Sequence, residues 1–191
     1  LARADLANPD TYDALAQMLD LPGLIDYLLV HFYIGNTDWP HHNWYAFRRR
    51  SPNALWRFVS YDSEHCLKEV SHDRTGVSDA DTPGELYSRL RSSPEFRLLF
   101  ADRVHRHFFN GGVYFVDPAN PAWDDAHPER NRPAALYHQR IAEIDPAIVL
   151  ESARWGDNQR PAQPFTRDRE WMAELNRLRT GYFPQRSATV L

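Results

Sequence analysis

Apolar residues at the start of the chain recur at helical spacing, and the first run begins at residues that favour a helix start. In "ANPDTYDALAQMLD", Asn8 suits the cap position and Pro9 suits the first turn. One face of this helix carries three apolar residues, Tyr12, Leu15 and Leu19. The next run, "LPGLIDYLLVHFYIG", is apolar at almost every position and predicts a second, buried helix that ends at Gly35.

Two aromatic, β-rich runs follow, "NWYAFRRR" and "ALWRFVSYD". The residues "SPN" between them are typical of a turn. This pattern predicts a β-hairpin from about Trp44 to Tyr61. The polar stretch "KEVSHDRTGVSDAD" then predicts a surface loop.

The remainder, residues 82–191, has mostly the spacing of helices. Thr82 and Glu85 form a capping-box pattern around Pro83, which predicts a helix start. In "SSPEFRLLFADRVHRHFF", Ser93 and Pro94 predict another start, and "NGG" predicts its end.

Two further helices are predicted, around residues 137–144 and 171–178. A proline inside a helix costs about 3 kcal/mol, so Asp145 and Pro146 are expected to start a new helix. The fold class predicted for residues 1–191 is a single domain, mainly α with a small β-hairpin.

Composition narrows the classes of partner. The chain has 191 residues, enough for one domain with a hydrophobic core, and its net charge of −4 gives no overall field that favours nucleic acid. Cys66 is the only cysteine, which excludes an internal disulfide and a cysteine-rich zinc site. No apolar run is long enough to cross a membrane. We therefore expect neither a nucleic-acid partner nor a membrane span in this chain.

The stretch "YIGNTDWPHHNWYAF" gathers polar side chains between two apolar segments. Asp38 and Asn43 have the D-x-x-x-x-N spacing of a protein-kinase catalytic loop, in which the Asp accepts a hydroxyl proton and the Asn holds a metal ion. The alternative is an ordinary turn in which these side chains bond local backbone amides. Spacing alone favours the turn.

Asp62 adds a second acidic residue, expected at the end of the second strand in "FVSYDSEHCL". Phosphoryl transfer needs such a ligand, and two carboxylates with one carboxamide form an oxygen-rich set that suits Mg²⁺ or Mn²⁺. Glu64 is a candidate further ligand. The alternatives are a strand-terminating Asp and a solvated Glu.

These motifs resemble those of the CotH-type kinases, the spore coat protein H family. The resemblance lies in "GNTDWPHHNWYAFRR" followed by "WRFVSYDSEH". It extends more loosely through "PEFRLLFADRVHRHFFNGG" and "ESARWGD" to the terminal segment, and so covers most of the chain.

The resemblance implies an atypical protein-kinase-like fold that transfers phosphate from ATP to protein hydroxyls. Asp38 would be the catalytic Asp, and Asn43 and Asp62 would bind the metal ions. The implied cofactors are ATP with Mg²⁺ or Mn²⁺, and the implied partner is a protein substrate with a hydroxyl acceptor.

Two departures qualify the resemblance. The family often shows D-x-D where this chain has Asp62, Ser63 and Glu64. No G-x-G-x-x-G motif is present, and the only lysine, Lys68, follows the loop instead of preceding it. We therefore expect a kinase-like C-lobe alone, with the N-lobe upstream of Leu1. The isolated chain is expected to be inactive as a kinase.

Two other functions stay open. The first is a non-catalytic pseudokinase or envelope scaffold that keeps the fold for binding. The second is a metal-dependent hydrolase that uses His41, His42 and the Glu64–His65 pair. The hydrolase is less favoured because adjacent His side chains are expected to diverge unless the loop bends sharply, and because no H-E-x-x-H motif is present.

Overall fold

The chain is mainly α-helical with one two-stranded antiparallel sheet, as the sequence predicts. In the computed structural model, residues 4–191 are described. They divide into two compact units, one running to Arg106 and the other from His107 to Thr189. The single-domain organisation expected from the sequence stays a prediction, and each unit is described by itself.

The first unit begins with helices α1 (Pro9–Ala16) and α2 (Leu21–Ile34). The side chain of Asn8 caps α1, as predicted, by accepting bonds from the backbone of its first turn. Asp20 caps α2 in the same way, by accepting the N–H of Gly23 at 3.0 Å. Most of α2 is buried, which explains its continuous apolar sequence.

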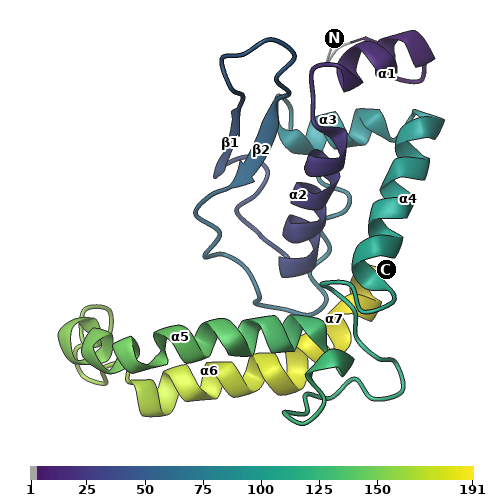
Figure 1. The fold of residues 1–191 in the computed structure, drawn as a ribbon. Coiled ribbons are helices and arrows are strands. Elements are labelled where there is room, and N and C mark those ends of the chain that lie inside the picture. The colour runs from purple at the N-terminus through teal and green to yellow at the C-terminus, as the bar shows by residue number, and fades with distance from the viewer. Residues whose placement is uncertain (1–3) are drawn as a thin grey trace. The chain divides into compact units, whose positions relative to one another are not determined.

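The predicted hairpin is present as β1 (Trp44–Phe47) and β2 (Arg57–Ser60), paired from Trp44 opposite Ser60 to Phe47 opposite Arg57. Strand β2 lies beside α2 (Figure 1). The ring of Phe58 lies 5.6 Å from that of Tyr27 on α2. This contact sets the hairpin against the helix that carries the chain into residues 35–43.

Helices α3 (Pro83–Leu90) and α4 (Pro94–Phe108) complete the first unit, and α4 ends at the boundary between the units. Thr82 and Ser93 cap them as predicted. Tyr87 of α3 contacts Phe32 of α2, with ring centroids 5.4 Å apart. Arg103 of α4 donates to Asp26 of α2 at 2.8 Å. Both helices therefore pack against α2.

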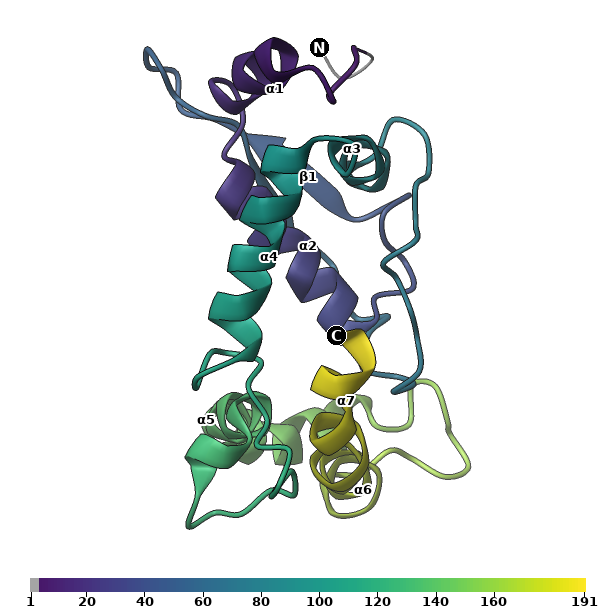
Figure 2. The ribbon, with the colours of Figure 1, turned by 90° about the vertical axis from the view of Figure 1, so that its right-hand side faces the viewer.

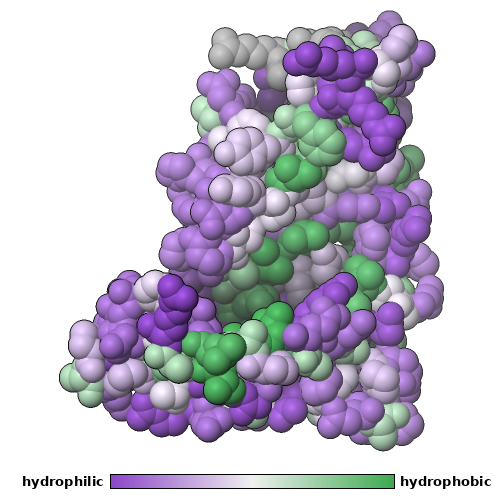
Figure 3. Space-filling view, turned by 60° about the vertical axis from the view of Figure 1, so that its left-hand side comes forward, coloured by the Kyte–Doolittle hydropathy of each residue, from purple (hydrophilic) through white to green (hydrophobic). Residues whose placement is uncertain are grey.

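The second unit contains a short 3₁₀ turn, η1 (Pro128–Arg130), and the long helix α5 (Arg132–Trp155). A second helical stretch alternates π and α geometry: η2 (Arg167–Trp171), α6 (Met172–Arg177), η3 (Leu178–Tyr182) and α7 (Phe183–Val190). Helices α5 and α6 run side by side (Figures 1 and 2), and hydrophobic side chains form a patch on this pair (Figure 3). Within residues 4–191, no helix has the length and hydrophobicity that a membrane crossing requires.

The expectation of a helix start at Asp145 and Pro146 is wrong, because α5 continues through both residues. The Asp145 carboxylate does not cap a helix. It accepts bonds from Arg167 at 2.5 Å and from the Trp171 indole at 3.0 Å. These contacts tie this turn of α5 to the neighbouring helix and stabilise it although Pro146 lacks an N–H.

Candidate active site

The loop that carries Asp38 starts where α2 ends, at Gly35. Gly35 has a φ of 60°, the left-handed conformation that glycine adopts without steric cost and that commonly closes a helix. Directly after it, the Asn36 side chain is fully buried and bonds in two directions. Its Oδ1 accepts the backbone N–H of Asp38 at 3.0 Å, and its Nδ2 donates to His31 Nδ1 at 3.3 Å. Asn36 therefore connects the loop to the buried side of α2.

Trp39 anchors the other side of Asp38. Its side chain is fully buried, and its indole N–H donates to the Tyr27 hydroxyl at 2.6 Å. The indole also stacks on the His31 ring, with centroids 4.7 Å apart and planes 9° from parallel. Asp38 is thus held between two buried residues, while 28% of its own side chain stays exposed.

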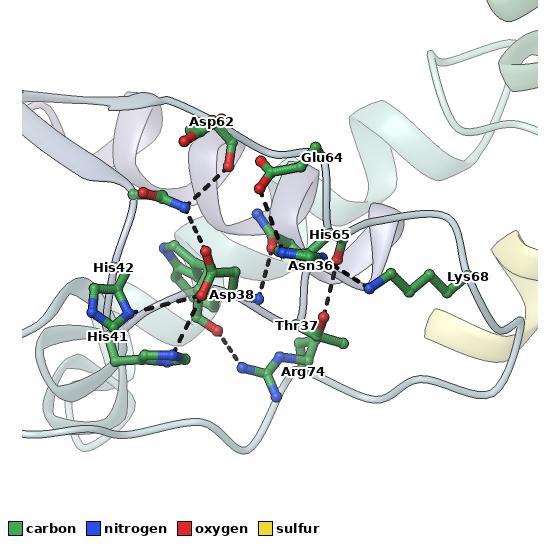
Figure 4. Close-up of polar contacts among 12 residues, drawn as sticks. Asn36, Thr37, Asp38, His41, His42, Asp62, Glu64, His65, Lys68 and Arg74 are labelled. Carbon is green, nitrogen blue, oxygen red and sulfur yellow. Dashed lines mark hydrogen bonds and ion pairs between the residues drawn. The ribbon is translucent and has the colours of Figure 1, made fainter. Parts of the chain in front are cut away.

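Asp38, Asn43 and Asp62 lie together in the structure (Figure 4). The Asn43 side-chain amide donates to Asp38 Oδ2 at 2.6 Å and to the backbone carbonyl of Asp62 at 3.2 Å. Asn43 and Asp62 both adopt left-handed backbone conformations, with φ of 58° and 48°, which Asn and Asp tolerate better than most residues. The predicted motif has two parts that are far apart in sequence, the loop with Asp38 and the segment with Asp62. The bonds from Asn43 join these two parts.

Asp62 lies two residues beyond the end of β2, so the expectation that it ends the strand is not met. Backbone hydrogen bonds hold the segment that follows Asp62 in place. The Thr37 N–H donates to the His65 carbonyl at 2.9 Å, and the Leu67 N–H donates to the Ile34 carbonyl at 2.7 Å. These bonds bring Glu64 and His65 beside the loop that carries Asp38.

The carboxyl groups of Asp62 and Glu64 interact directly. A hydrogen bond with Glu64 and the negative charge of Glu64 raise the pKa of Asp62, and Asp38 adds a smaller electrostatic contribution. Backbone hydrogen bonding lowers the pKa of Glu64, and the contact with Asp62 acts in the same direction. Neighbouring carboxylates of this kind concentrate negative charge that a cation would neutralise.

The chemistry of the donors fits a hard divalent cation. Asp62 and Glu64 provide carboxylate oxygens, and Asn43 provides an amide oxygen because its amide nitrogen is engaged by Asp38 and Asp62. Mg²⁺ and Mn²⁺ favour such oxygen ligands. These residues would hold the metal ion if one binds here.

Two His side chains contact the Asp38 carboxylate, and a ligand atom of a third, His65, lies within 4.8 Å of it. His41 Nε2 and His42 Nδ1 lie 3.5 and 3.8 Å from Asp38 Oδ1, and their rings are 4.6 Å apart. Adjacent His side chains diverge unless the loop bends sharply, and here the loop turns between Asp38 and Asn43, so both rings reach the same oxygen. His65 lies 3.5 Å from Glu64 and 2.9 Å from the Lys68 amine.

Sequence reasoning missed the buried residues beneath the loop, His31 and Tyr27, and gave no role to Asn36. The sequence carries a signal for Asn36, since an Asn side chain often accepts the backbone N–H of the residue two positions later, in an Asx turn. Its bond to Asp38 has this geometry. No comparable local signal marks His31 or Tyr27, because their contacts come from packing between distant segments.

Comparison with known proteins identifies one family. The family described as CotH kinase protein matches residues 3–110, which include the loop, the hairpin and the acidic segment described above. Searches of curated proteins and of solved structures gave no match. More than half of the chain is thus covered by one family, and the chain belongs to the CotH kinase family.

Proposed function

We propose that this chain is the C-lobe of a metal-dependent protein kinase that transfers phosphate from ATP to a protein hydroxyl. Membership of a kinase family suggests the use of ATP and a divalent metal ion in general. The observation that carries the proposal is the pair of bonds from Asn43, to Asp38 Oδ2 and to the Asp62 carbonyl. They join the proposed base, one metal ligand and the segment that carries the other ligands.

Asp38 is the proposed group that orients the acceptor hydroxyl and takes its proton. Asn43 occupies Oδ2, so Oδ1 is the oxygen that would receive the hydroxyl. The backbone bond to Asn36 and the burial of Trp39 keep the carboxylate in place. Positioning of this kind supplies much of the catalysis in phosphoryl transfer.

Asn43, Asp62 and Glu64 are the proposed metal ligands. A Mg²⁺ or Mn²⁺ ion held there would neutralise charge on the transferring phosphoryl group. Glu64 stands where the family pattern often has Asp and is longer by one methylene. The backbone bonds at His65 and Leu67 hold its segment against the catalytic loop, so the longer side chain remains beside Asp62.

The groups that grip nucleotide phosphates in kinases are a glycine-rich loop and a lysine. The sequence of this chain has no G-x-G-x-x-G motif, and its only lysine is Lys68. We propose that an amino-terminal lobe supplies these groups and that the chain alone transfers phosphate only at background rates.

The test is transfer of labelled phosphate from ATP, with Mg²⁺ or Mn²⁺, by the protein that joins this chain to its amino-terminal lobe. Asp38→Asn should reduce the rate by about 100-fold or more, since a general base contributes at least that much. Asp79→Asn, at an exposed loop acid of the same unit, is the matched control and should keep the rate. Equal rates for wild type and Asp38→Asn would contradict the proposal, and no transfer by the wild type would favour the scaffold.

A further inference from the structure

The two adjacent His residues, His41 and His42, have no role in the proposed kinase chemistry, and they form a cluster with Asp38. His41 Nε2 and His42 Nδ1 approach the same carboxylate oxygen, Oδ1, at 3.5 and 3.8 Å (Figure 4). One ligand atom from each of the three residues lies within 4.8 Å of the others. The His side chains are 46% and 69% exposed, so an ion can reach them from solvent.

The spacing of these atoms fits a tetrahedral metal ion. Zn²⁺ binds His nitrogens and carboxylate oxygens at about 2.0–2.2 Å, which places neighbouring ligand atoms about 3.4 Å apart. The separations of 3.5 and 3.8 Å exceed this value by only a few tenths of an ångström. The two imidazole ligand atoms lie within 4.8 Å of each other. Side-chain rotations that close this gap would bring all three atoms onto one ion, with a water in the fourth position.

The donor types select against the ion expected for phosphoryl transfer. Imidazole nitrogen suits Zn²⁺ and similar transition metals, whereas Mg²⁺ prefers carboxylate, carbonyl and water oxygens. The cluster has two imidazoles and one carboxylate. Its preference is thus opposite to that of the oxygen donors of Asn43, Asp62 and Glu64.

A competing cluster shares Asp38 but is less suitable. Asp38, Glu64 and His65 also bring ligand atoms within 4.8 Å of one another. However, the Lys68 amine lies 2.9 Å from His65 Nδ1, which places a positive charge beside that imidazole. This cluster also has one imidazole fewer. Both differences favour the pair His41 and His42.

We propose that Asp38, His41 and His42 bind a Zn²⁺-type transition-metal ion and that this ion occupies the carboxylate oxygen needed for catalysis. Asn43 already bonds Asp38 Oδ2, so a metal ion on Oδ1 would leave neither oxygen for the acceptor hydroxyl. The ion would act as an inhibitor and not as a hydrolytic centre. This inhibitory role rests on the function proposed for Asp38, whereas the metal site itself does not.

Binding can be measured on the 191-residue chain by titrating chelator-treated protein with ZnCl₂ in a calorimeter. We expect one strong site that MgCl₂ does not occupy. Replacing both residues, His41→Ala with His42→Ala, should weaken binding by about tenfold or more, and so should Asp38→Asn. Removing a residue that only orients a metal ligand lowers metal affinity by about 10–100-fold. Removing the ligands themselves should therefore cost at least as much.

Two matched controls test the competing ligands. His65→Ala removes the other nearby imidazole, and Cys66→Ser removes the only thiol, and neither should change the Zn²⁺ affinity. The proposal is overturned if the double His variant binds Zn²⁺ as tightly as the wild type. It is equally overturned if His65→Ala or Cys66→Ser weakens binding more than the double variant does.

The kinase assay separates this inference from the proposed function. In an active preparation, micromolar Zn²⁺ should inhibit phosphoryl transfer by the wild type more strongly than by the double His variant, each compared with its own rate without Zn²⁺. Zn²⁺ binding without any kinase activity would leave the metal site in place and refute the kinase. Kinase activity without a Zn²⁺ site at these residues would support the proposed function and refute the metal site.

Discussion

The side chain of Asn36 accepts the backbone N–H of Asp38 at 3.0 Å, and so fixes the proposed catalytic residue to a buried polar pair. The same side chain donates to His31 Nδ1, and both Asn36 and His31 are fully buried. Buried polar groups that lose a partner carry the full cost of desolvation. The loop therefore depends on a polar contact made inside the hydrophobic core.

Asn36→Ala should destabilise the protein by about 1–3 kcal/mol, because it leaves the Asp38 N–H and His31 Nδ1 without their partner. The measurement is the urea midpoint for unfolding of the first unit, detected by the change in fluorescence of the tryptophans in that unit. Asn158→Ala, at an exposed site, is the control and should change stability little. A wild-type midpoint for Asn36→Ala would show that the bond contributes nothing to stability.

His31 should make stability depend on pH. Burial lowers the pKa of His31 from its usual value of 6.5 to about 4, so between these values the unfolded state binds a proton that the folded state does not. Stability should therefore rise with pH across this window and fall on acidification below pH 6.5, with a slope of up to about 1.4 kcal/mol per pH unit.

His31→Gln removes the titrating group and keeps an acceptor for Asn36. Unfolding free energies measured between pH 5 and 7 should lose most of their slope in this variant. An unchanged slope in His31→Gln would assign the pH dependence to other groups.

Gly84 lies where α3 closely approaches the loop that carries Asp38. A Cβ at this position would lie 2.9 Å from Pro40 Cγ and 2.9 Å from the Val77 carbonyl oxygen. Gly84→Ala should therefore destabilise the protein by about 1–3 kcal/mol through overpacking. The paired control is Gly76→Ala, where a Cβ meets nothing within 4 Å and where lower unfolded-state entropy predicts a neutral or slightly stabilising effect. Equal melting temperatures for the two variants would rule out the predicted clash.

Asp62→Asn should weaken Mn²⁺ binding by about tenfold or more, because it removes an exposed side chain that we propose as a metal ligand. Thermal stability should not fall, because repulsion with Glu64 is relieved. Asn is preferable to Ala at this position because the backbone is left-handed, with a φ of 48°, which would add a cost of its own for Ala. Calorimetric Mn²⁺ titration and a melting curve on the same preparation provide the test. Asp79→Asn should bind Mn²⁺ as the wild type does, and an unfolded Asp62→Asn would point to a structural role instead.

Local chemistry along the chain was enough to predict most elements of the fold. Asn8, Thr82 and Ser93 start helices because each side chain bonds amides only two or three residues away. The hairpin followed from alternating aromatic residues around a turn. The order of Asp38, Asn43 and Asp62 also sufficed to suggest the family, since a motif is a property of sequence and spacing.

Other features depend on contacts between residues distant in sequence. Pro146 stays inside α5, where the Asp145 carboxylate is held by Arg167, 22 positions further along the chain. His31 lies under the loop because Trp39 stacks on it, and His41 and His42 meet at Asp38 because the loop turns back. Spacing predicted that Asp38 and Asn43 could cooperate, but only folding could bring the Asp62 carbonyl within 3.2 Å of Asn43. Short-range hydrogen bonds decide where elements begin, whereas the packing of α2 against the hairpin and α3 decides which side chains share a site.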